Sequence, residues 1–261
     1  MRVTATLLVC CLAAGNVMAA ELQPETLAAF DKYIHESEAR MQPRFEPGGA
    51  FLWVDEQAQR KAQVRAGRVV IENRGGRGSI PVPGGLIHDW IGAVFIPGVT
   101  LPQTLALVQD YDHNHDHFAP EVMASKLVSR HGDDFKVYLR LMKKKVITVI
   151  LDTDYDVRYS PLDGGRCHSR AYSTRIAEIG NPGKPDEHAL PPGKDHGFLW
   201  RLYSYWRFQE REGGVYVECE AISLTRAIPA GLGWLIQPII QNLPRESLEN
   251  TLHETREALG K

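Results

Sequence analysis

The stretch FLWRLYSYWRFQEREGGVYVECEAISLTRAI, residues 198–228, decides the fold of this chain. Two runs of alternating residues flank Gly213 and Gly214, a glycine pair typical of a tight β-hairpin turn. Because successive side chains of a strand point to opposite faces, each run divides its residues into two sets. In the first run, one face carries Phe198, Trp200, Leu202, Ser204, Trp206 and Phe208, and the other carries Arg201, Tyr203, Tyr205 and Arg207. The sequence therefore predicts an antiparallel hairpin with one aromatic face.

The second run of the hairpin is divided in the same way. Glu218 and Glu220 lie on one face, and the other face carries small or apolar residues, namely Val217, Cys219, Ala221, Ser223 and Thr225. When the aromatic face and this small-residue face coincide, the two acidic residues meet the arginines of the first run across the strands. Large rings beside small side chains do not fill the volume above a sheet evenly. We therefore expect a helix or a ligand to occupy that volume.

The segment after the hairpin supplies such a helix. Pro229, Gly231 and Gly233 end the strand, and an apolar stripe follows within residues 232–243. Pro244 restarts a helical pattern, in which Leu248, Leu252, Thr255 and Leu259 repeat on one side. The pattern predicts a long C-terminal helix that is interrupted twice and packs on the sheet.

Further strands and one further helix precede the hairpin. Strand patterns cover residues 87–96, 125–130, 135–142, 146–153 and 166–179, and Thr100 is a typical helix N-cap. Residues 23–42 read as an amphipathic helix, and glycines and prolines between residues 73 and 85 indicate a boundary near residue 79. The predicted class is α+β, with a curved antiparallel sheet wrapped on the C-terminal helix. Residues 21–79 form an N-terminal helical extension and linker, and residues 80–261 form the main domain.

Composition excludes several classes of protein. The 261 residues are 43% hydrophobic and 24% charged, with a formal net charge of -2. These values are typical of a folded globular chain, and they lack the basic excess of a nucleic-acid-binding protein. The glycines between residues 75 and 85 have neither the spacing of a dinucleotide fingerprint nor the Lys-Ser/Thr pair of a phosphate loop. We expect no nucleic-acid partner and no cofactor.

Residues 1–20 have the pattern of a cleavable signal peptide. Arg2 is the only charge before Glu21, an apolar run of about a dozen residues follows it, and Ala19 and Ala20 mark the expected cleavage region. An uncleaved membrane anchor is the alternative, but the run is well short of the ~20 residues that span a bilayer. The predicted location is periplasmic or secreted.

Two cysteines, Cys167 and Cys219, remain after such a cleavage. An oxidising compartment permits a disulfide between them. The predicted strand pairing places them two strands apart, about 9–10 Å, which is beyond disulfide reach. Two buried free thiols are the favoured interpretation, and the disulfide stays open at this point.

The order of elements from Ile87 to Leu259 resembles that of the START-like helix-grip superfamily, also called SRPBCC, which includes polyketide cyclases and coenzyme Q-binding proteins. The local similarity is best at residues 92–97, at residues 110–112 with 120–122, and at residues 228–234. The resemblance covers about two thirds of the chain. It implies a hydrophobic cavity between sheet and C-terminal helix, which binds a lipid, a quinone or a polyketide-like molecule without a metal. The N-terminal extension and the loop 181–197 lie outside the pattern and are expected to cap the cavity.

Candidate cavity residues follow from the predicted faces and from this resemblance. The apolar candidates are Trp200, Leu202, Trp206, Phe208, Cys219, Ala221, Trp234, Ile236, Leu248 and Leu252. The polar candidates His168, Arg170 and Tyr172 have the chemistry to orient a polar ligand head or to assist a cyclisation, and the alternative is an ordinary strand face with cross-strand pairs.

Two other functions compete with simple binding. One is an enzyme, either cyclase-like or a metal-dependent hydrolase that uses His113, His115 and His117, which lie among three aspartates. Asp116 directly follows His115, which departs from the metallo-β-lactamase spacing, so an exposed polar loop is favoured and no catalytic residue is assigned. The other is transient contact of the apolar stripe at 232–243, including Trp234, with a membrane or a protein partner. The sequence does not predict the identity of the ligand or the oligomeric state.

Overall fold

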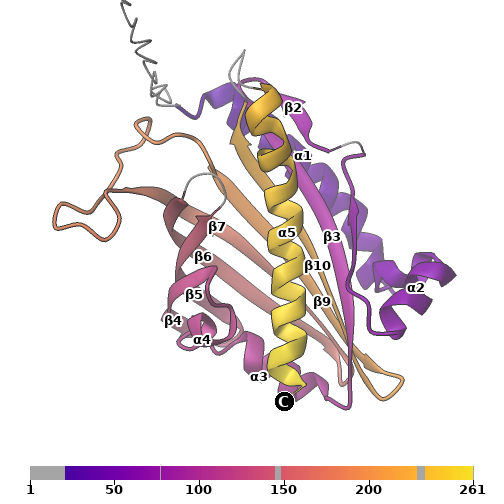
Figure 1. Ribbon diagram of the computed structural model, residues 1–261. Helices are drawn as coiled ribbons and strands as arrows, with labels where there is room; N and C mark the ends of the chain where they lie inside the picture. The colour runs from indigo at the N-terminus through magenta and orange to yellow at the C-terminus, as the bar shows by residue number, and fades with distance from the viewer. Residues whose placement is uncertain (1–20, 77, 145–147, 228–232, 261) are drawn as a thin grey trace, which may run out of the picture.

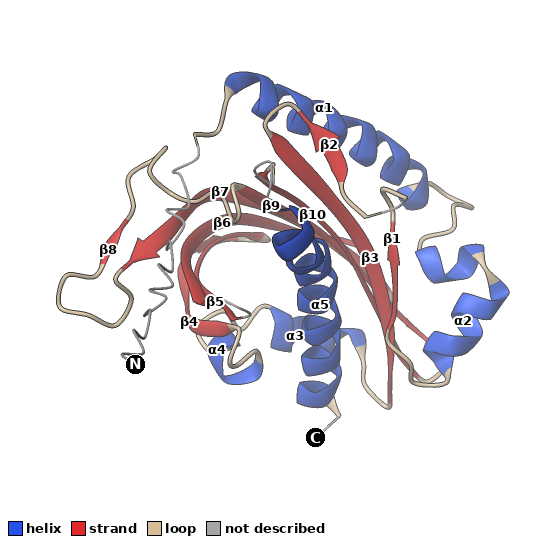
Figure 2. Cartoon of the chain, turned by 45° about the horizontal axis from the view of Figure 1, so that its top comes forward, coloured by secondary structure: helices blue, strands red, loops and turns tan. Residues whose placement is uncertain are grey.

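A long C-terminal helix lies inside a strongly curved antiparallel sheet (Figures 1 and 2). The computed structural model describes residues 21–76, 78–144, 148–227 and 233–260, with side chains of the last segment described from residue 242. The described strands form the order β1-β3-β10-β9-β7-β6-β5-β4, with β2 on β3 and β8 on β7. The strands are β1 (Val70–Asn73), β2 (Ile80–Val82), β3 (Gly85–Pro97), β4 (Val122–His131), β5 (Asp134–Lys144), β6 (Thr148–Asp163), β7 (Arg166–Gly180), β8 (His188–Ala189), β9 (Arg201–Arg211) and β10 (Gly214–Arg226). The helices are α1 (Pro24–Met41), η1 (Gln42–Phe45), η2 (Trp53–Glu56), α2 (Ala58–Arg65), α3 (Leu101–Val108), α4 (Asn114–His117) and α5 (Gly233–Leu259).

The predicted fold class is confirmed. The chain is α+β, and its curved antiparallel sheet grips the C-terminal helix α5, which is the helix-grip arrangement. The predicted hairpin joins β9 to β10, and its turn is formed by Glu212 and Gly213, with φ of 56° and 77°. Two successive positive φ values are typical of the turn whose twist matches that of the flanking strands. Gly214, predicted to lie in the turn, is already the first residue of β10.

Helix α5 departs from the prediction in one respect. It runs from Gly233 to Leu259 as one helix of 27 residues, so the predicted interruption at Pro244 is wrong. A proline removes one backbone donor from a helix, and this loss is tolerated where tertiary packing holds the helix in place. Leu248 and Leu252, one and two turns beyond Pro244, are 4% and 0% exposed and provide that packing.

The N-terminal extension covers the face of the sheet that is turned away from α5. Figure 2 shows α1 on the opposite side of β3 from α5. Phe30 and Ile34 of α1 are buried together with Ile87, Ile222 and Leu224 of the sheet. The expectation that this extension caps the ligand cavity is therefore wrong. Strand β1, which precedes the predicted boundary at residue 79, pairs with β3, so both sides of that boundary contribute to one sheet.

The sheet thus has two apolar layers. We call the face toward α5 the inner face and the face toward α1 and α2 the outer face. The inner layer includes Val94, Phe208 and Val217, packed with Leu248 and Leu252 of α5. Thr100 caps α3 with a full capping box, as predicted, which fixes the turn from β3 into α3 at one end of this layer.

Among the described residues, no helix has the length and apolar character needed to cross a membrane.

Candidate functional site

The hairpin register assigns the inner face. Val217 pairs with Phe208, Cys219 with Trp206, and Ser223 with Leu202, so these side chains share one face. Gly92 of β3 pairs with Cys219, and a Cβ atom on Gly92 would lie 2.7 Å from Leu252 Cδ1 of α5. This close approach identifies the face as the inner one.

Helix α5 is tied to the sheet along two sides. On one side it rests on β3 and β10 through Leu248 and Leu252. On the other side Lys143 Nζ, at the end of β5, donates to Ser247 Oγ of α5 at 2.7 Å. Glu121 accepts from Asn250 Nδ2 at 2.9 Å and forms an ion pair with Lys143. The strands β9, β7 and β6 lie between these two sides in the order of the sheet.

Apolar side chains on the inner face remain partly exposed, both between these two sides and on β3 and β10 themselves. Leu202 and Trp206 of β9, Ala171 of β7, Ala221 of β10 and Trp90 of β3 are all half-buried, although each faces the interior of the curved sheet. The Trp206 ring stacks on Phe208, with 6.0 Å between centroids and an interplanar angle of 4°. Partly exposed rings and methyl groups in such a position offer an apolar molecule a surface for binding.

A cluster of aromatic residues closes one end of the inner face. The hydroxyl groups of Tyr111 and Tyr159 lie 3.0 Å apart, and Phe135 packs edge to face against both rings. Burial raises the pKa of Tyr111 to about 12 and the pKa of Tyr159 further above its ordinary value, so both groups are neutral hydrogen-bonding groups near neutral pH. Leu101 and Leu105 of α3 pack on this cluster.

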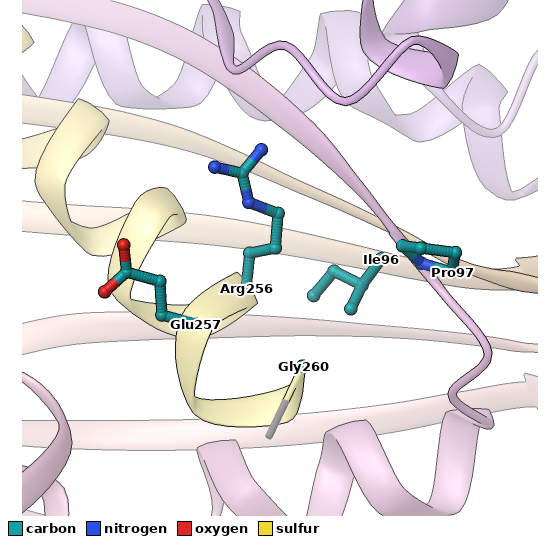
Figure 3. A pocket seen from close by; sticks show the side chains of 5 residues that line it. All are labelled: Ile96, Pro97, Arg256, Glu257 and Gly260. Atoms are coloured by element: carbon teal, nitrogen blue, oxygen red, sulfur yellow. The ribbon is translucent and has the colours of Figure 1, made fainter.

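An open depression of about 510 Å³ lies at the rim of the inner face, where the end of α5 meets the end of β3 (Figure 3). Its lining combines Ile96 and Pro97 with Arg256, Glu257 and Gly260. Arg256 reaches across to Gly67 and donates to its carbonyl oxygen. The two charged side chains distinguish this depression from the apolar cavity that the sequence predicts.

Most of the predicted cavity residues lie on the inner side. Leu202, Trp206, Phe208, Cys219 and Ala221 are on the inner face, and Leu248 and Leu252 reach it from α5. Trp234 and Ile236 belong to α5, but their side chains lie outside the described residues.

Trp200 lies on the outer side, contrary to the prediction. It precedes the first paired residue of β9, so strand alternation does not extend to it. Its side chain is buried with Phe30 and Leu224, and its indole nitrogen donates to Asp195 Oδ1 at 3.3 Å.

The three polar candidates also lie on the outer face. His168 pairs with Arg207, and its ring stacks on Phe45 at 4.1 Å between centroids. Tyr172 donates to Glu38 of α1, and the Arg170 guanidinium lies over the Tyr172 ring. The sheet therefore separates these residues from the inner face, and their predicted role in the cavity is wrong. The register with β9 decides their side, because a shift by one residue exchanges the two faces.

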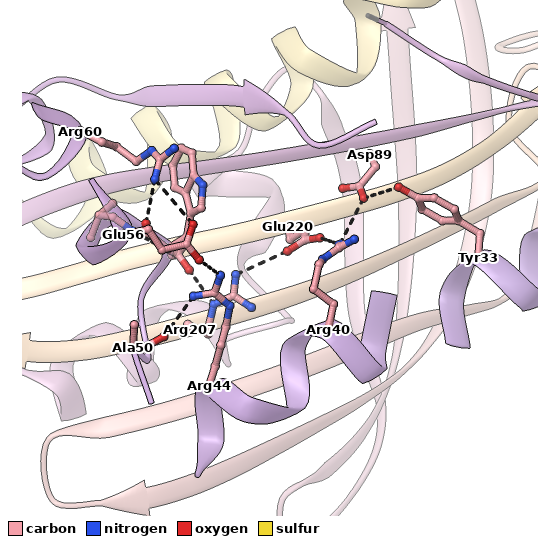
Figure 4. A network of polar contacts seen from close by, with 12 residues as sticks. Tyr33, Arg40, Arg44, Ala50, Glu56, Arg60, Asp89, Arg207 and Glu220 are labelled. Atoms are coloured by element: carbon pink, nitrogen blue, oxygen red, sulfur yellow. Dashed lines mark hydrogen bonds and ion pairs between the residues drawn. The ribbon is translucent and has the colours of Figure 1, made fainter. Parts of the chain in front are cut away.

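A buried polar network joins the N-terminal extension to the outer face (Figure 4). Arg207 Nε donates to Glu218 Oε1 at 2.6 Å, and these residues are cross-strand partners, as predicted for the arginines and the acidic pair. Arg40 Nη2 of α1 donates to Glu220 Oε1 at 2.5 Å. Tyr33 Oη donates to Asp89 Oδ2 at 2.7 Å.

The carboxyl group of Asp89 has a pKa that is high for an aspartate. Burial and, after it, the nearby charge of Glu220 raise its pKa from 3.8 to about 7. Tyr33 and Arg40 oppose this rise, because they favour the ionised carboxylate.

The histidine cluster at residues 113–117 lies in and beside the short helix α4. His113 Nδ1 lies 2.8 Å from Asp110 Oδ1, and His115 Nδ1 lies 3.0 Å from Ser125 Oγ. In the part of the chain that the structure describes, no three or more His, Cys, Asp or Glu residues are grouped so that they could hold a metal ion.

Cys167 and Cys219 are buried free thiols on β7 and β10, with β9 between these strands.

Sequence reasoning missed several inner-face residues. His88 and Trp90 alternate with Ile87 and Asp89 along β3 and face inward. Tyr111 lies within residues 110–112, a range that the sequence marks only by its similarity to the START-like superfamily. The alternation within residues 87–96 could have grouped His88 and Trp90 with Gly92 on one face. The contact of Gly92 with α5 identifies that face as the inner one.

The chain is similar to several solved structures. No protein-family model matches the chain, and no curated protein matches it. The solved structures to which it is similar include proteins described as START-related. They include a STAR-related lipid transfer protein from Xanthomonas axonopodis, with 19% identity over 70% of this chain and 99% of that one, at a TM-score of 0.46. Another is the Zhui aromatase/cyclase from Streptomyces sp. R1128, with 10% identity over 66% of this chain and 93% of that one, at a TM-score of 0.47. Human STARD10 has 10% identity over 76% of this chain and 79% of that one, at a TM-score of 0.44.

Proposed function

We propose that the protein binds an apolar small molecule, such as a lipid, a quinone or a polyketide-like compound, between the inner face and α5. The observation that carries this proposal is the partial exposure of Leu202, Trp206, Ala171 and Trp90 on a face that curls around a helix. Covering such surface gains roughly 25 cal/mol per Å² of apolar area removed from water. The ligand then completes an apolar layer that the side chains leave open.

The cyclase-like and metal-hydrolase alternatives have less support. The polar residues that favoured a cyclase, His168, Arg170 and Tyr172, lie on the outer face. Of the histidines that favoured a hydrolase, His113 bonds to Asp110 and His115 to Ser125, and no metal-binding group is found among the described residues. We therefore infer binding or transport of the apolar molecule as the function.

A titration with an apolar fluorescent probe tests the proposal. N-phenyl-1-naphthylamine is added to the purified protein and to an Ala171→Phe variant, in which the new ring occupies space above the inner face. The control, Thr174→Phe, adds a similar ring at an exposed position of the same strand. Thermal unfolding of each variant establishes that it is folded.

We expect the probe to bind the wild-type protein and the Thr174→Phe variant, and to bind Ala171→Phe at least tenfold more weakly. Equal binding to a folded Ala171→Phe variant would place the site elsewhere and overturn the proposal. Extraction of the purified protein with organic solvent, followed by mass spectrometry, then identifies the compound that the cell supplies.

We further propose that the chain is exported and that the ligand is bound in the periplasm or outside the cell. This proposal rests on residues 1–20, whose charge and apolar pattern are typical of a signal peptide. We also propose that the segment 232–243 contacts a membrane, and this proposal likewise rests on the sequence alone. An apolar ligand has to come from an apolar environment and return to one, and a membrane provides such an environment.

A further inference from the structure

Among the residues that the structure describes, three polar atoms at one end of the inner face have no hydrogen-bond partner. They are Nδ1 of His88, Nε1 of Trp90 and Oδ1 of Asn73, and all three are shielded from solvent. His88 and Trp90 are alternate residues of β3, so they share the inner face, and Asn73 of β1 is the cross-strand partner of Trp90. A buried polar atom without a partner costs free energy, so three such atoms on adjacent residues indicate a group that completes them.

The three atoms differ in hydrogen-bonding character. The Trp90 indole is a donor, and the Asn73 carbonyl oxygen is an acceptor, since the Asn73 amide nitrogen donates to Gly78 O at 2.7 Å. His88 Nε2 lies 3.1 Å from Thr225 Oγ1, whose own proton is directed to Arg226 O at 3.4 Å. We therefore assign the ring proton of His88 to Nε2, which leaves Nδ1 as an acceptor.

The protonation of His88 is consistent with this assignment. Its side chain is fully buried, and burial lowers its pKa from 6.5 to about 4, so the ring is neutral near neutral pH. A neutral imidazole has one donor and one acceptor nitrogen, and only the acceptor is unused here.

The neighbouring strand places only small side chains opposite His88 and Trp90. The residues of β10 opposite His88 and Trp90 are Ser223 and Ala221, both small. Trp90 itself is half-buried, although its indole nitrogen is shielded. The residues of β10 therefore fill little of the volume beside His88 and Trp90.

We propose that the end of the inner face formed by Asn73, His88 and Trp90 binds an uncharged hydroxyl group, so that the ligand of this protein is an apolar molecule with an alcohol at one end. This inference rests on the proposed function and specifies its ligand class. A hydroxyl group donates to one of the two acceptors and accepts from the indole. A carboxylate accepts only and meets two acceptors with one donor, so it fits less well. An alkane leaves all three atoms unpartnered.

Three ten-carbon molecules that differ only at one end test this specificity. Decan-1-ol, decane and decanoate are compared for displacement of N-phenyl-1-naphthylamine from the full-length folded protein at pH 8, where a carboxyl group of ordinary pKa is ionised. We expect decan-1-ol to displace the probe about fivefold to tenfold more effectively than decane, the effect of one or two net hydrogen bonds, and decanoate to be the weakest.

Variants then assign the effect to these residues. Trp90→Phe keeps an aromatic ring but removes the donor, and Asn73→Leu removes an acceptor with a side chain of similar size. Each is expected to reduce the preference for the alcohol over the alkane to less than about threefold while the probe still binds. Trp200→Phe is the matched control, because it makes the same replacement on the outer face and leaves the preference unchanged.

The outcomes separate this inference from the proposed function. If the probe binds but the wild-type protein does not prefer the alcohol, or prefers decanoate, the inference is overturned and the apolar site stands. If the preference persists in both folded variants, these residues do not form the polar end, which also overturns the inference. If the probe does not bind the wild-type protein, the proposed function fails first.

Discussion

Gly92 of β3 and Leu252 of α5 approach each other so closely that no side chain fits between them. A Cβ atom on Gly92 would lie 2.7 Å from Leu252 Cδ1 and 3.1 Å from Ile71 Cγ1. The absence of a side chain at this position lets α5 lie against β3, which sets the height of the helix above the inner face. Any compound bound on that face occupies volume that this contact helps to define.

The first prediction concerns this contact. Replacement of Gly92 by alanine should lower the free energy of unfolding by about 1–3 kcal/mol, because the added methyl group displaces leucine side chains from a packed interface. Urea unfolding followed by tryptophan fluorescence measures the change. Gly164→Ala is the control, because a Cβ there meets no atom within 4 Å, and we expect a change within about 0.5 kcal/mol. Equal stability of the two variants would show that α5 is not held at Gly92.

The second prediction concerns the ion pair between Arg207 and Glu218, whose side chains are each 1% exposed. Arg207→Met should destabilise the protein by about 3–5 kcal/mol, because it leaves a buried carboxylate without its partner. The double variant Arg207→Met with Glu218→Met should recover part of this loss, since it removes both charges.

An exposed pair provides the control for this experiment. Lys136 and Asp156 form an ion pair in which both side chains are more than half exposed. Lys136→Ala should change the stability by less than about 1 kcal/mol. A double variant at residues 207 and 218 that is less stable than Arg207→Met alone would contradict the interpretation.

The third prediction concerns pH and Asp89. The pKa of this carboxyl group is raised from 3.8 to about 7 in the folded protein, so the folded state binds a proton more tightly than the unfolded state does. Its contribution to stability is therefore fully present below about pH 4 and is lost as the pH rises toward about 7.

Comparison of the wild type with Asp89→Asn isolates this contribution. The stability of the wild type relative to the variant should fall as the pH rises from about 4 to about 7, with a slope of up to about 1.4 kcal/mol per pH unit. Thermal unfolding at several pH values measures the difference. A difference that does not change with pH would show that Asp89 is ionised throughout this range.

The fourth prediction concerns the first 20 residues. We expect cleavage near Ala19 or Ala20, so that the protein recovered after export begins at or close to Glu21. Intact-mass measurement of the exported protein gives the new N-terminus. Leu8→Arg places a charge in the apolar run and should leave the full-length precursor inside the cell, whereas Thr4→Ser should be processed normally. Recovery of a chain that still carries Met1 would contradict the prediction.

Sequence patterns were sufficient to predict the long strands, the hairpin and the division of β9 and β10 into two faces, but not the short strands β1, β2 and β8. The pattern is strong there because one face packs against apolar side chains and the other carries charges that pair across strands, as Arg207 and Glu218 do. The helix-grip fold follows from a curved sheet with an aromatic face followed by one long amphipathic helix. Most of the inner-face residues were therefore predictable, including Trp206, Phe208 and Leu252.

The side of the sheet that each remaining element occupies depends on long-range packing. His168, Arg170 and Tyr172 alternate correctly with their neighbours, but their side depends on the register between β7 and β9. The position of α1 on the outer face depends on contacts between residues far apart in the chain, such as Arg40 with Glu220. Local periodicity fixes which residues share a face, because it depends on the geometry of one strand. It does not fix which face is covered by which element, because that choice depends on the summed packing and charge pairing of the whole molecule.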